Sequence, residues 1–185
     1  MDPAVEHNVV ENYTYILTDN YDVRFIAYAP LHTFKGWTCK EVEAQIGIDF
    51  DAQTIAFAKA RAKTRCFDTG HADRNKAMAD YLKIDQYPEA TIELTEVKSF
   101  ARMDDTCYKA EVLAVLEFMG RVRQLPLNFI VTRSADNMGC SIDLDFKWSF
   151  KAFGLKAPSL LFLTVRDIVD ISGKGEFIQT IMNNG

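Results

Sequence analysis

The feature that most constrains the fold of this sequence is a regular alternation of apolar and polar side chains. Residues 141–150 read SIDLDFKWSF, so every second side chain is apolar. Residues 42–50 follow the same period. Weaker alternation covers residues 13–18, 23–28, 91–100, 108–119, 125–132 and 162–171. Because successive side chains of a β-strand point to opposite faces of a sheet, this pattern predicts an all-β protein.

Short polar segments rich in turn-forming residues separate the predicted strands. They are Asp19-Asn20, Asp51-Ala52-Gln53, Asp104-Asp105, Asp136-Asn137-Met138-Gly139 and Ser172-Gly173. Strands joined in this way predict an antiparallel meander, and closure into a barrel removes its open edges and its wet inner face. No linker or repeat divides the 185 residues. We therefore predict one domain over residues 1–185, a single antiparallel up-and-down β-barrel of about eight strands, with its core at about residues 13–177.

The alternation stops in residues 67–88, which read FDTGHADRNKAMADYLKIDQYP. Residues 71–83 have helical spacing, with one apolar face formed by Ala77, Met78, Tyr81 and Leu82. Asp68 or Thr69 is suited to cap the start of a helix, and Pro88 blocks its continuation. The sequence therefore predicts one short inserted helix near residues 71–83, lying against the barrel as a cap on one end.

Residues 55–66 combine a basic row with a row of small side chains. The basic row is Lys59, Arg61, Lys63 and Arg65, and the opposite row is Ala56, Ala58, Ala60, Ala62 and Thr64. The basic row fits either an anion-binding stripe or a solvated outer face. The small row fits either a barrel with room for a ligand or a barrel filled by large side chains from opposite strands.

Composition excludes several classes of function. The formal net charge of −5 argues against nucleic acid as a partner. The longest apolar run, residues 160–165, is too short for a transmembrane segment, and the first dozen residues do not resemble a targeting segment. The three histidines lie far apart, so no metal site is predicted, and we expect free thiols at the four scattered cysteines, Cys39, Cys66, Cys107 and Cys140. Two disulfides are the alternative for an exported chain.

The insertion and its flanks resemble the hallmark of the YceI-like family of lipocalin-like, polyisoprenoid-binding proteins. The matching residues are Phe67-Asp68-Thr69-Gly70, Arg74-Asn75, Met78 and Tyr87-Pro88, followed by Thr91-Ile92. Other segments agree in order and spacing, namely residues 22–25, 34–37, 116–120, 125–127 and 153–155. The resemblance covers about residues 13–177. Two positions depart from the family pattern, because Ala77 stands where a histidine is common and residues 119–123 differ from the usual HGVTK turn.

The resemblance implies a lipocalin-like barrel that binds, stores or transports a long-chain amphiphilic lipid without catalysing a reaction. An isoprenoid quinone, a polyprenyl lipid or a fatty-acid derivative is the expected ligand, and no other cofactor is expected. Apolar and aromatic side chains suit such a tail, and Arg74 suits a head group or an ion pair with Asp68 or Asp80. The predicted cavity lining or mouth is Phe25, Ala27, Phe34, Trp37, Phe57, Phe67, Arg74, Met78, Tyr81, Leu82, Phe118, Phe146, Trp148, Phe150 and Phe153.

Two other functions stay open at this point. An enzyme acting on a small apolar substrate would use His71, Asp73 or Arg74, although no catalytic constellation can be assembled and no catalytic residue is predicted. A filled barrel would instead serve as an interaction module, with the basic row as its contact face. Apolar outer positions such as Ile26 and Tyr28 predict a homodimer. The missing leader favours a cytoplasmic location, whereas the resemblance favours the periplasm.

Overall fold

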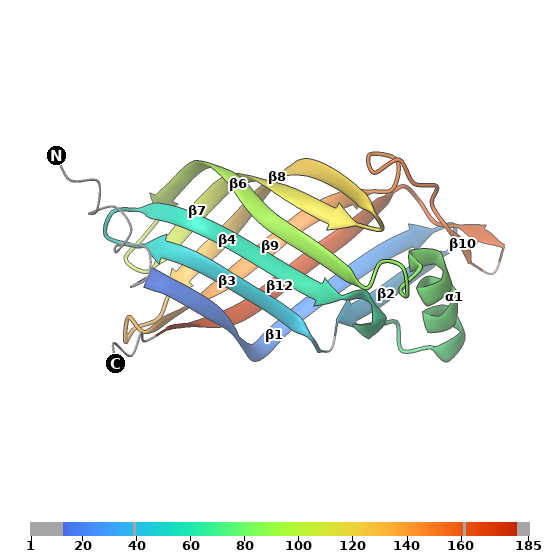
Figure 1. Cartoon of the computed structure of the whole chain (residues 1–185), viewed down its shortest axis with the longest axis horizontal. Coiled ribbons are helices and arrows are strands. Elements are labelled where there is room, and N and C mark those ends of the chain that lie inside the picture. The colour runs from blue at the N-terminus through green and yellow to red at the C-terminus, as the bar shows by residue number, and fades with distance from the viewer. Residues whose placement is uncertain (1–12, 39, 161, 181–185) are drawn as a thin grey trace.

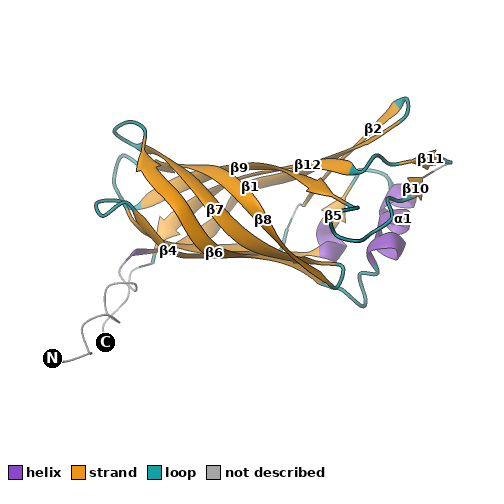
Figure 2. Ribbon diagram, turned by 90° about the horizontal axis from the view of Figure 1, so that it is seen from above, coloured by secondary structure: helices purple, strands orange, loops and turns teal. Residues whose placement is uncertain are grey.

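The computed structural model describes residues 13–38, 40–160 and 162–180, which form a closed β-barrel with one α-helix at one end (Figures 1 and 2). The helix, α1, spans Ala72–Leu82, close to the predicted residues 71–83. The strands are β1 Thr14–Ala29, β2 His32–Thr38, β3 Val42–Asp49, β4 Thr54–Lys63, β5 Phe67–Asp68, β6 Glu89–Arg102, β7 Cys107–Phe118, β8 Arg121–Arg133, β9 Gly139–Ser149, β10 Ser159–Leu160, β11 Leu163–Thr164 and β12 Ile168–Gln179.

The barrel closes because β1 pairs with β12, the last strand of the chain. Around the ring the order is β1-β3-β4-β6-β7-β8-β9-β12, and each neighbouring pair is antiparallel. Residues 14–16 of β1 pair with β3, and residues 23–29 pair with β2, so β2 and β3 form one interrupted strand beside β1. Eight strands therefore surround the interior. The predicted all-β, antiparallel barrel with one inserted helix is confirmed.

Two of the predicted strand assignments are wrong. Residues 13–18 and 23–28 belong to the same strand, because the chain between Leu17 and Tyr21 makes a bulge-like irregularity instead of a turn. The closing strand is β12, and the Ser172-Gly173 segment lies inside it, whereas residues 162–171 contain β11 and a loop before β12 begins. Glycines interrupt the apolar alternation of β12. At Gly175 a side chain would not fit, because a Cβ there would lie 2.5 Å from the side chain of Leu17.

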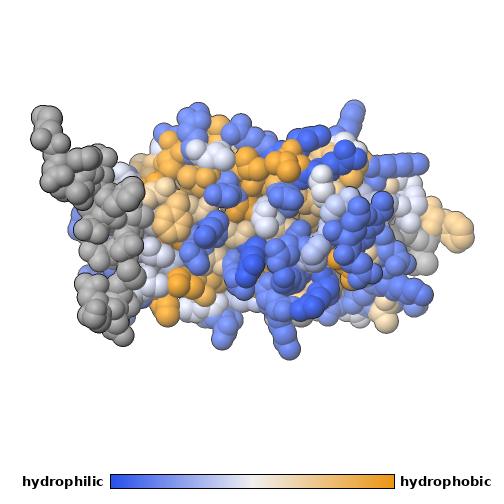
Figure 3. Space-filling view, viewed as in Figure 1, coloured by the Kyte–Doolittle hydropathy of each residue, from blue (hydrophilic) through white to orange (hydrophobic). Residues whose placement is uncertain are grey.

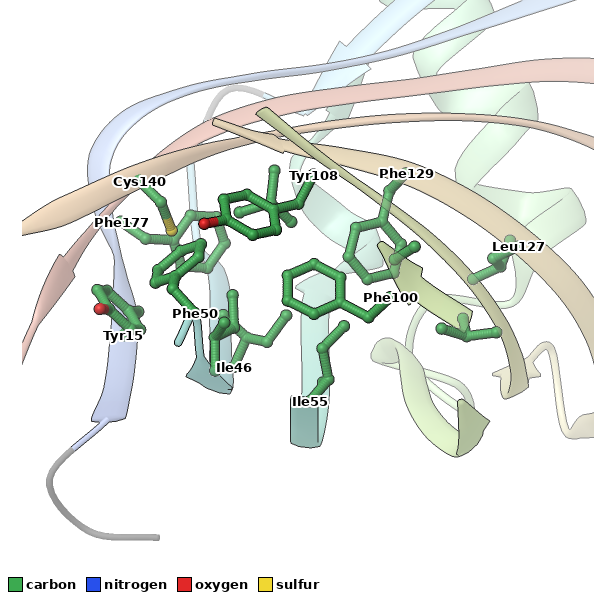
Figure 4. Close-up of a cluster of buried hydrophobic side chains, with 14 of the residues drawn as sticks. Tyr15, Ile46, Phe50, Ile55, Phe100, Tyr108, Leu127, Phe129, Cys140 and Phe177 are labelled. Carbon is green, nitrogen blue, oxygen red and sulfur yellow. The ribbon is translucent and has the colours of Figure 1, made fainter. Parts of the chain in front are cut away.

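Aromatic side chains fill the barrel at the end away from α1 (Figure 4). Phe50 lies at the centre of this group, with ring centroids 5.8 Å from Tyr15, 6.4 Å from Phe100 and 5.0 Å from Tyr108. Phe177 of β12 is buried in the same cluster. These buried aromatic rings supply a large share of the apolar area whose removal from water stabilises the barrel. The packing closes this end of the interior.

The cysteines that the structure describes have different surroundings. Cys140 is buried in the aromatic end, and burial raises the pKa of its thiol to about 12. Cys107 and Cys140 are free thiols, and Cys66 donates a hydrogen bond to Glu41 Oε2 at 3.0 Å. The prediction for Cys39 lies outside the described residues.

The basic row of residues 59–65 lies on the outer surface, and three of its four side chains form ion pairs with neighbouring acids. Figure 3 shows that hydrophilic residues cover much of this side of the molecule. Arg61 contacts Glu43 at 2.7 Å, and Lys63 forms an ion pair with Glu89. Arg65, just beyond β4, contacts Glu41 at 2.7 Å. Exposed pairs of this kind contribute little stability, but they leave little uncompensated positive charge. The row is a solvated outer face, and the ion pairs of Arg61, Lys63 and Arg65 fit this better than an anion-binding stripe.

The outer positions behind the dimer prediction are partly covered. Ile26 and Tyr28 are half-buried, and the Tyr28 hydroxyl donates a hydrogen bond to Asp170 Oδ2 at 2.6 Å. The hydrogen bond from Lys147, together with the one from Tyr28, holds the pKa of Asp170 below its usual range. The homodimer stays a prediction.

Candidate functional site

A cavity of about 240 Å³ lies between α1 and the barrel interior. Side chains of β1, β2, β7, β9 and β12 form its wall, and α1 covers it. Cavities of about 150 Å³ with apolar walls already stay free of water and bind small apolar molecules. The cavity therefore has room for part of an apolar ligand.

The helix contributes one continuous face to this cavity. Ala77, Met78, Tyr81 and Leu82 all line it, as their spacing predicts, and Arg74 lies one turn earlier on the same face. The Tyr81 hydroxyl donates a hydrogen bond to the carbonyl oxygen of Lys156 at 2.7 Å, and its ring packs edge-on against Phe150. Burial raises the pKa of Tyr81. These contacts hold α1 over the end of the barrel.

The turn before the helix is held by a small hydrogen-bond network. Asn75 Nδ2 and the backbone N–H of Gly70 both donate to Asp68 Oδ1, at 2.8 and 2.7 Å, and they lower the pKa of Asp68. Thr69 donates through its backbone N–H and its hydroxyl to Asn75 Oδ1. The predicted capping role of Asp68 or Thr69 is wrong, because the residue at the cap position is His71, which makes no side-chain cap bond. Asp68 instead anchors the first turn of α1 through Asn75.

Twelve of the fifteen predicted side chains lie in the wall of this cavity, and whether they contact a ligand stays a prediction. They are Phe25, Ala27, Phe34, Phe67, Arg74, Met78, Tyr81, Leu82, Phe118, Phe146, Trp148 and Phe150. The other three residues line neither cavity. Phe57 lies over Gly47 on the outer face, Trp37 is 39% exposed, and Phe153 is buried with its ring 5.3 Å from Trp148 without lining the cavity.

The positions of Phe57 and Trp37 have local physical causes. Phe57 precedes the inward-facing Ala58 and pairs with Gly47, so simple alternation places it on the outer face, while the bulge leaves Ala56 as the extra residue. In β2 the inward positions belong to Phe34 and Gly36, so Trp37 faces away from the cavity. The ring of Phe25 occupies the space beside Gly36, where a Cβ would lie 2.1 Å from it.

A second cavity, of about 180 Å³, lies deeper in the barrel. Val23 lines both cavities, so the two adjoin at this residue. Small side chains make the room, because Ala58 and Ala60 of the predicted alanine row face inward opposite residues such as Ala114. Ala56 is exposed, and Ala62 and Thr64 do not line either cavity. The interior is therefore not filled by side chains from opposite strands.

Two polar atoms in the wall of the first cavity lack hydrogen-bond partners within the described part of the chain. They are Thr38 Oγ1 and Trp148 Nε1, and both residues are more than nine-tenths buried. A buried polar group without a partner costs roughly 1–3 kcal/mol, so each atom favours a ligand that carries a hydrogen-bond acceptor. Sequence reasoning missed Thr38, since a threonine at the end of a strand gives no distinctive signal.

Arg74 adds an uncompensated positive charge to the same cavity. Its guanidinium lies over the ring of Phe34, 5.7 Å from the centroid. The predicted ion pairs with Asp68 and Asp80 are not formed, and in residues 13–38, 40–160 and 162–180 Arg74 has no acidic partner. Arg24 also lines the cavity, but it forms an ion pair with Asp22 at 2.7 Å. Of these two arginines, Arg74 is the one whose charge is available to a ligand.

The other residues of the enzymatic interpretation lie apart from the cavities. His71 and Asp73 are exposed at the start of α1 and line neither cavity. Among the residues with described positions, no group of three histidine, cysteine or acidic side chains could hold a metal ion. Likewise, none of the helices in the described ranges is long and apolar enough to cross a membrane.

Comparison with known proteins places this fold among solved relatives. The family model of the YceI-like domain matches residues 17–177. No curated protein matches the sequence significantly. The crystal structure of Burkholderia cenocepacia BcnA is similar, with a TM-score of 0.67 and 20% identity, covering 89% of this chain and 99% of that one.

Two further solved structures share the fold. A polyisoprenoid binding domain from Saccharophagus degradans, implicated in plant cell wall breakdown, superposes with a TM-score of 0.71 at 15% identity, covering 91% of this chain and 99% of that chain. The YCEI protein of Campylobacter jejuni has a TM-score of 0.63 and 18% identity, covering 80% of this chain and 86% of its own. At these identities the likeness shows the fold alone.

Proposed function

Because this chain belongs to the YceI-like family, we propose that it binds a long-chain amphiphilic lipid inside its barrel, for storage or transport, without catalysing a reaction. The ligand class is an isoprenoid quinone, a polyprenyl lipid or a fatty-acid derivative. The observation that carries the proposal is the pair of adjoining apolar cavities, which meet at Val23 and together follow the barrel interior. The description of the Saccharophagus degradans domain as polyisoprenoid binding supports the same class.

The filled end of the barrel supports one orientation for the proposed ligand. Phe50, Tyr108 and their neighbours close the end away from α1, so a tail enters from the helix end and its tip lies in the deep cavity beside Ala58 and Ala60. The head group then lies near Arg74 and the indole N–H of Trp148. A carboxylate, a phosphate or a quinone carbonyl offers the acceptor oxygens that these donors need.

Native mass spectrometry of gently purified protein, followed by lipid extraction, tests the proposal. We expect an adduct whose released component has a long apolar tail and an oxygen-bearing head group. Apo protein should take up fluorescent fatty acids or a quinone, since each buried methylene contributes about 0.8 kcal/mol. A protein that is purified without lipid and takes up neither probe would refute the proposed function.

Replacing Arg74 with glutamine tests the position of the head group. Arg74→Gln removes the charge but keeps a hydrogen-bonding side chain, so stearate should bind roughly tenfold more weakly, as expected for the loss of a charge-assisted hydrogen bond. Stearyl alcohol, which has no charge, should bind nearly as before. Fluorescence displacement measures both affinities.

Arg24→Gln is the matched control, because Arg24 lines the same cavity but is already paired with Asp22. Its effect on stearate binding should stay below about twofold, as for an exposed ion pair. Equal losses in the two variants, or an equal loss for the alcohol and the acid in Arg74→Gln, would place the head group elsewhere.

The enzymatic alternative rests on Arg74 alone, since His71 and Asp73 line neither cavity. An arginine stays protonated at ordinary pH and cannot act as a general base. A positively charged side chain beside an apolar cavity fits the binding of a head group better than proton transfer. The position of Arg74 therefore supports a role in binding over a role in catalysis.

A further inference from the structure

Two hairpins project beyond the barrel at the end where α1 lies (Figures 1 and 2). One joins β1 to β2, and the other joins β10 to β11. They are tied together, because the backbone N–H of Arg166 donates to the carbonyl oxygen of Tyr28 at 2.6 Å. Phe34 of β2 and Val165, which follows β11, also line the first cavity. The two hairpins therefore border the same end of the barrel through which a ligand would enter.

Each hairpin carries a large apolar side chain in an unfavourable position. Leu31 is 99% exposed and has a φ of 65°, and Phe162 is fully exposed with a φ of 68°. The left-handed conformation favours glycine or asparagine, and it is rare for large side chains. Figure 3 shows apolar atoms at the tip of the molecule where Figure 1 places β10. Neither burial nor backbone geometry in this chain explains why leucine and phenylalanine occupy these turns.

The segments that contain these two hairpins and their flanks are basic, in a chain with a net charge of −5. Residues 29–38 and 150–166 contain Lys35, Lys151, Lys156 and Arg166 and no aspartate or glutamate. All four side chains belong to exposed residues, and within the described ranges none of them forms an ion pair. Exposed apolar tips, flanked in the sequence by cations without ion pairs, match the chemistry of an anionic lipid surface.

We infer that the helix end of the barrel docks on an anionic lipid bilayer. Leu31 and Phe162 enter the boundary between head groups and acyl chains, and the four cations lie at the level of the lipid phosphates. In this position the cavity faces the membrane, so a lipid could pass between bilayer and barrel without crossing water. This goes beyond the proposed function, and docking does not require a bound ligand.

Vesicle co-sedimentation with equal parts of phosphatidylglycerol and phosphatidylcholine tests the inference. The wild-type chain should bind these vesicles, and Leu31→Asn/Phe162→Asn should lower the partition coefficient at least tenfold, since two apolar side chains no longer insert. Asparagine suits the left-handed turns, so the double variant should melt at or above the wild-type temperature. Met103→Asn is the control, because Met103 is 60% exposed beside the β6–β7 turn at the opposite end and should have no effect.

The charge contribution is tested separately with Lys156→Gln/Arg166→Gln. Each cation near an anionic surface is worth a factor of roughly five, so this variant should bind roughly 20- to 30-fold more weakly, and high salt should weaken wild-type binding. Equal binding of the tip variant and the wild type would overturn the inference. So would a wild-type chain that ignores the vesicles, including one that instead self-associates through Leu31 and Phe162. Since apo protein is used, failure here is distinct from failure to bind a lipid in the cavity.

Discussion

Replacing Phe50 with alanine is expected to lower the free energy of unfolding by about 3–5 kcal/mol, the cost of deleting a large side chain from a core that cannot collapse around the gap. Phe50 is 4% exposed and contacts three other aromatic rings. The guanidinium of Arg133 also lies 5.0 Å from its ring centroid. All of these contacts are lost at once, so the effect should be near the upper end of the range. Urea denaturation followed by near-ultraviolet circular dichroism measures it.

Phe162→Ala is the matched control for this substitution. It deletes the same atoms from a side chain that is fully exposed, so the free energy of unfolding should change by no more than about 0.5 kcal/mol. A loss below about 1 kcal/mol in Phe50→Ala would mean that the aromatic cluster does not close this end of the barrel. The proposed direction of ligand entry would then lose its support.

Replacing Ala58 with leucine should shorten the ligand that the barrel accepts. Ala58 lines the deep cavity, so three added carbons occupy space proposed for the tip of a long tail. Stearate then loses burial of three to four methylenes, at about 0.8 kcal/mol each, which weakens binding roughly a hundredfold. Octanoate, which does not reach this depth, should bind within about twofold of the wild type. Displacement titrations with the two acids measure the difference.

Ala56→Leu offers a close control on the same strand. The bulge makes Ala56 the extra, exposed residue of β4, so its leucine points away from both cavities. It should leave the affinities for both acids unchanged. Thermal melts of both variants exclude a general loss of packing as the cause. Equal weakening of octanoate and stearate in Ala58→Leu would contradict a tail that reaches the deep cavity.

Local patterns predicted much of the fold and part of the candidate site. The alternation in residues 141–150 gave the inward face of β9, and Phe146, Trp148 and Phe150 all line the first cavity. Helical spacing likewise predicted the face of α1. Both succeeded because the period of a regular element is a property of the chain itself.

The errors arose where one residue was added or where regularity ended. The bulge at Ala56 moved that alanine out of the inward row, and Phe57 faces outward because it alternates with the inward-facing Ala58. Asp68 looked like a helix cap because it precedes the helix, yet its partner is Asn75, within the helix. The order of residue types along the chain does not show which hydrogen bond a polar side chain makes.

The sequence by itself determined the strands, the inserted helix and the family to which the chain belongs, because each depends on the order and spacing of residues. The tertiary structure decided where the interior is open. Ring closure brings Ala58, Ala114 and Gly173 together around one space, while Phe50 and Tyr108 fill another. It also leaves Trp148 Nε1 without a partner in the described residues. These features depend on distances across the barrel, which form only when β1 meets β12.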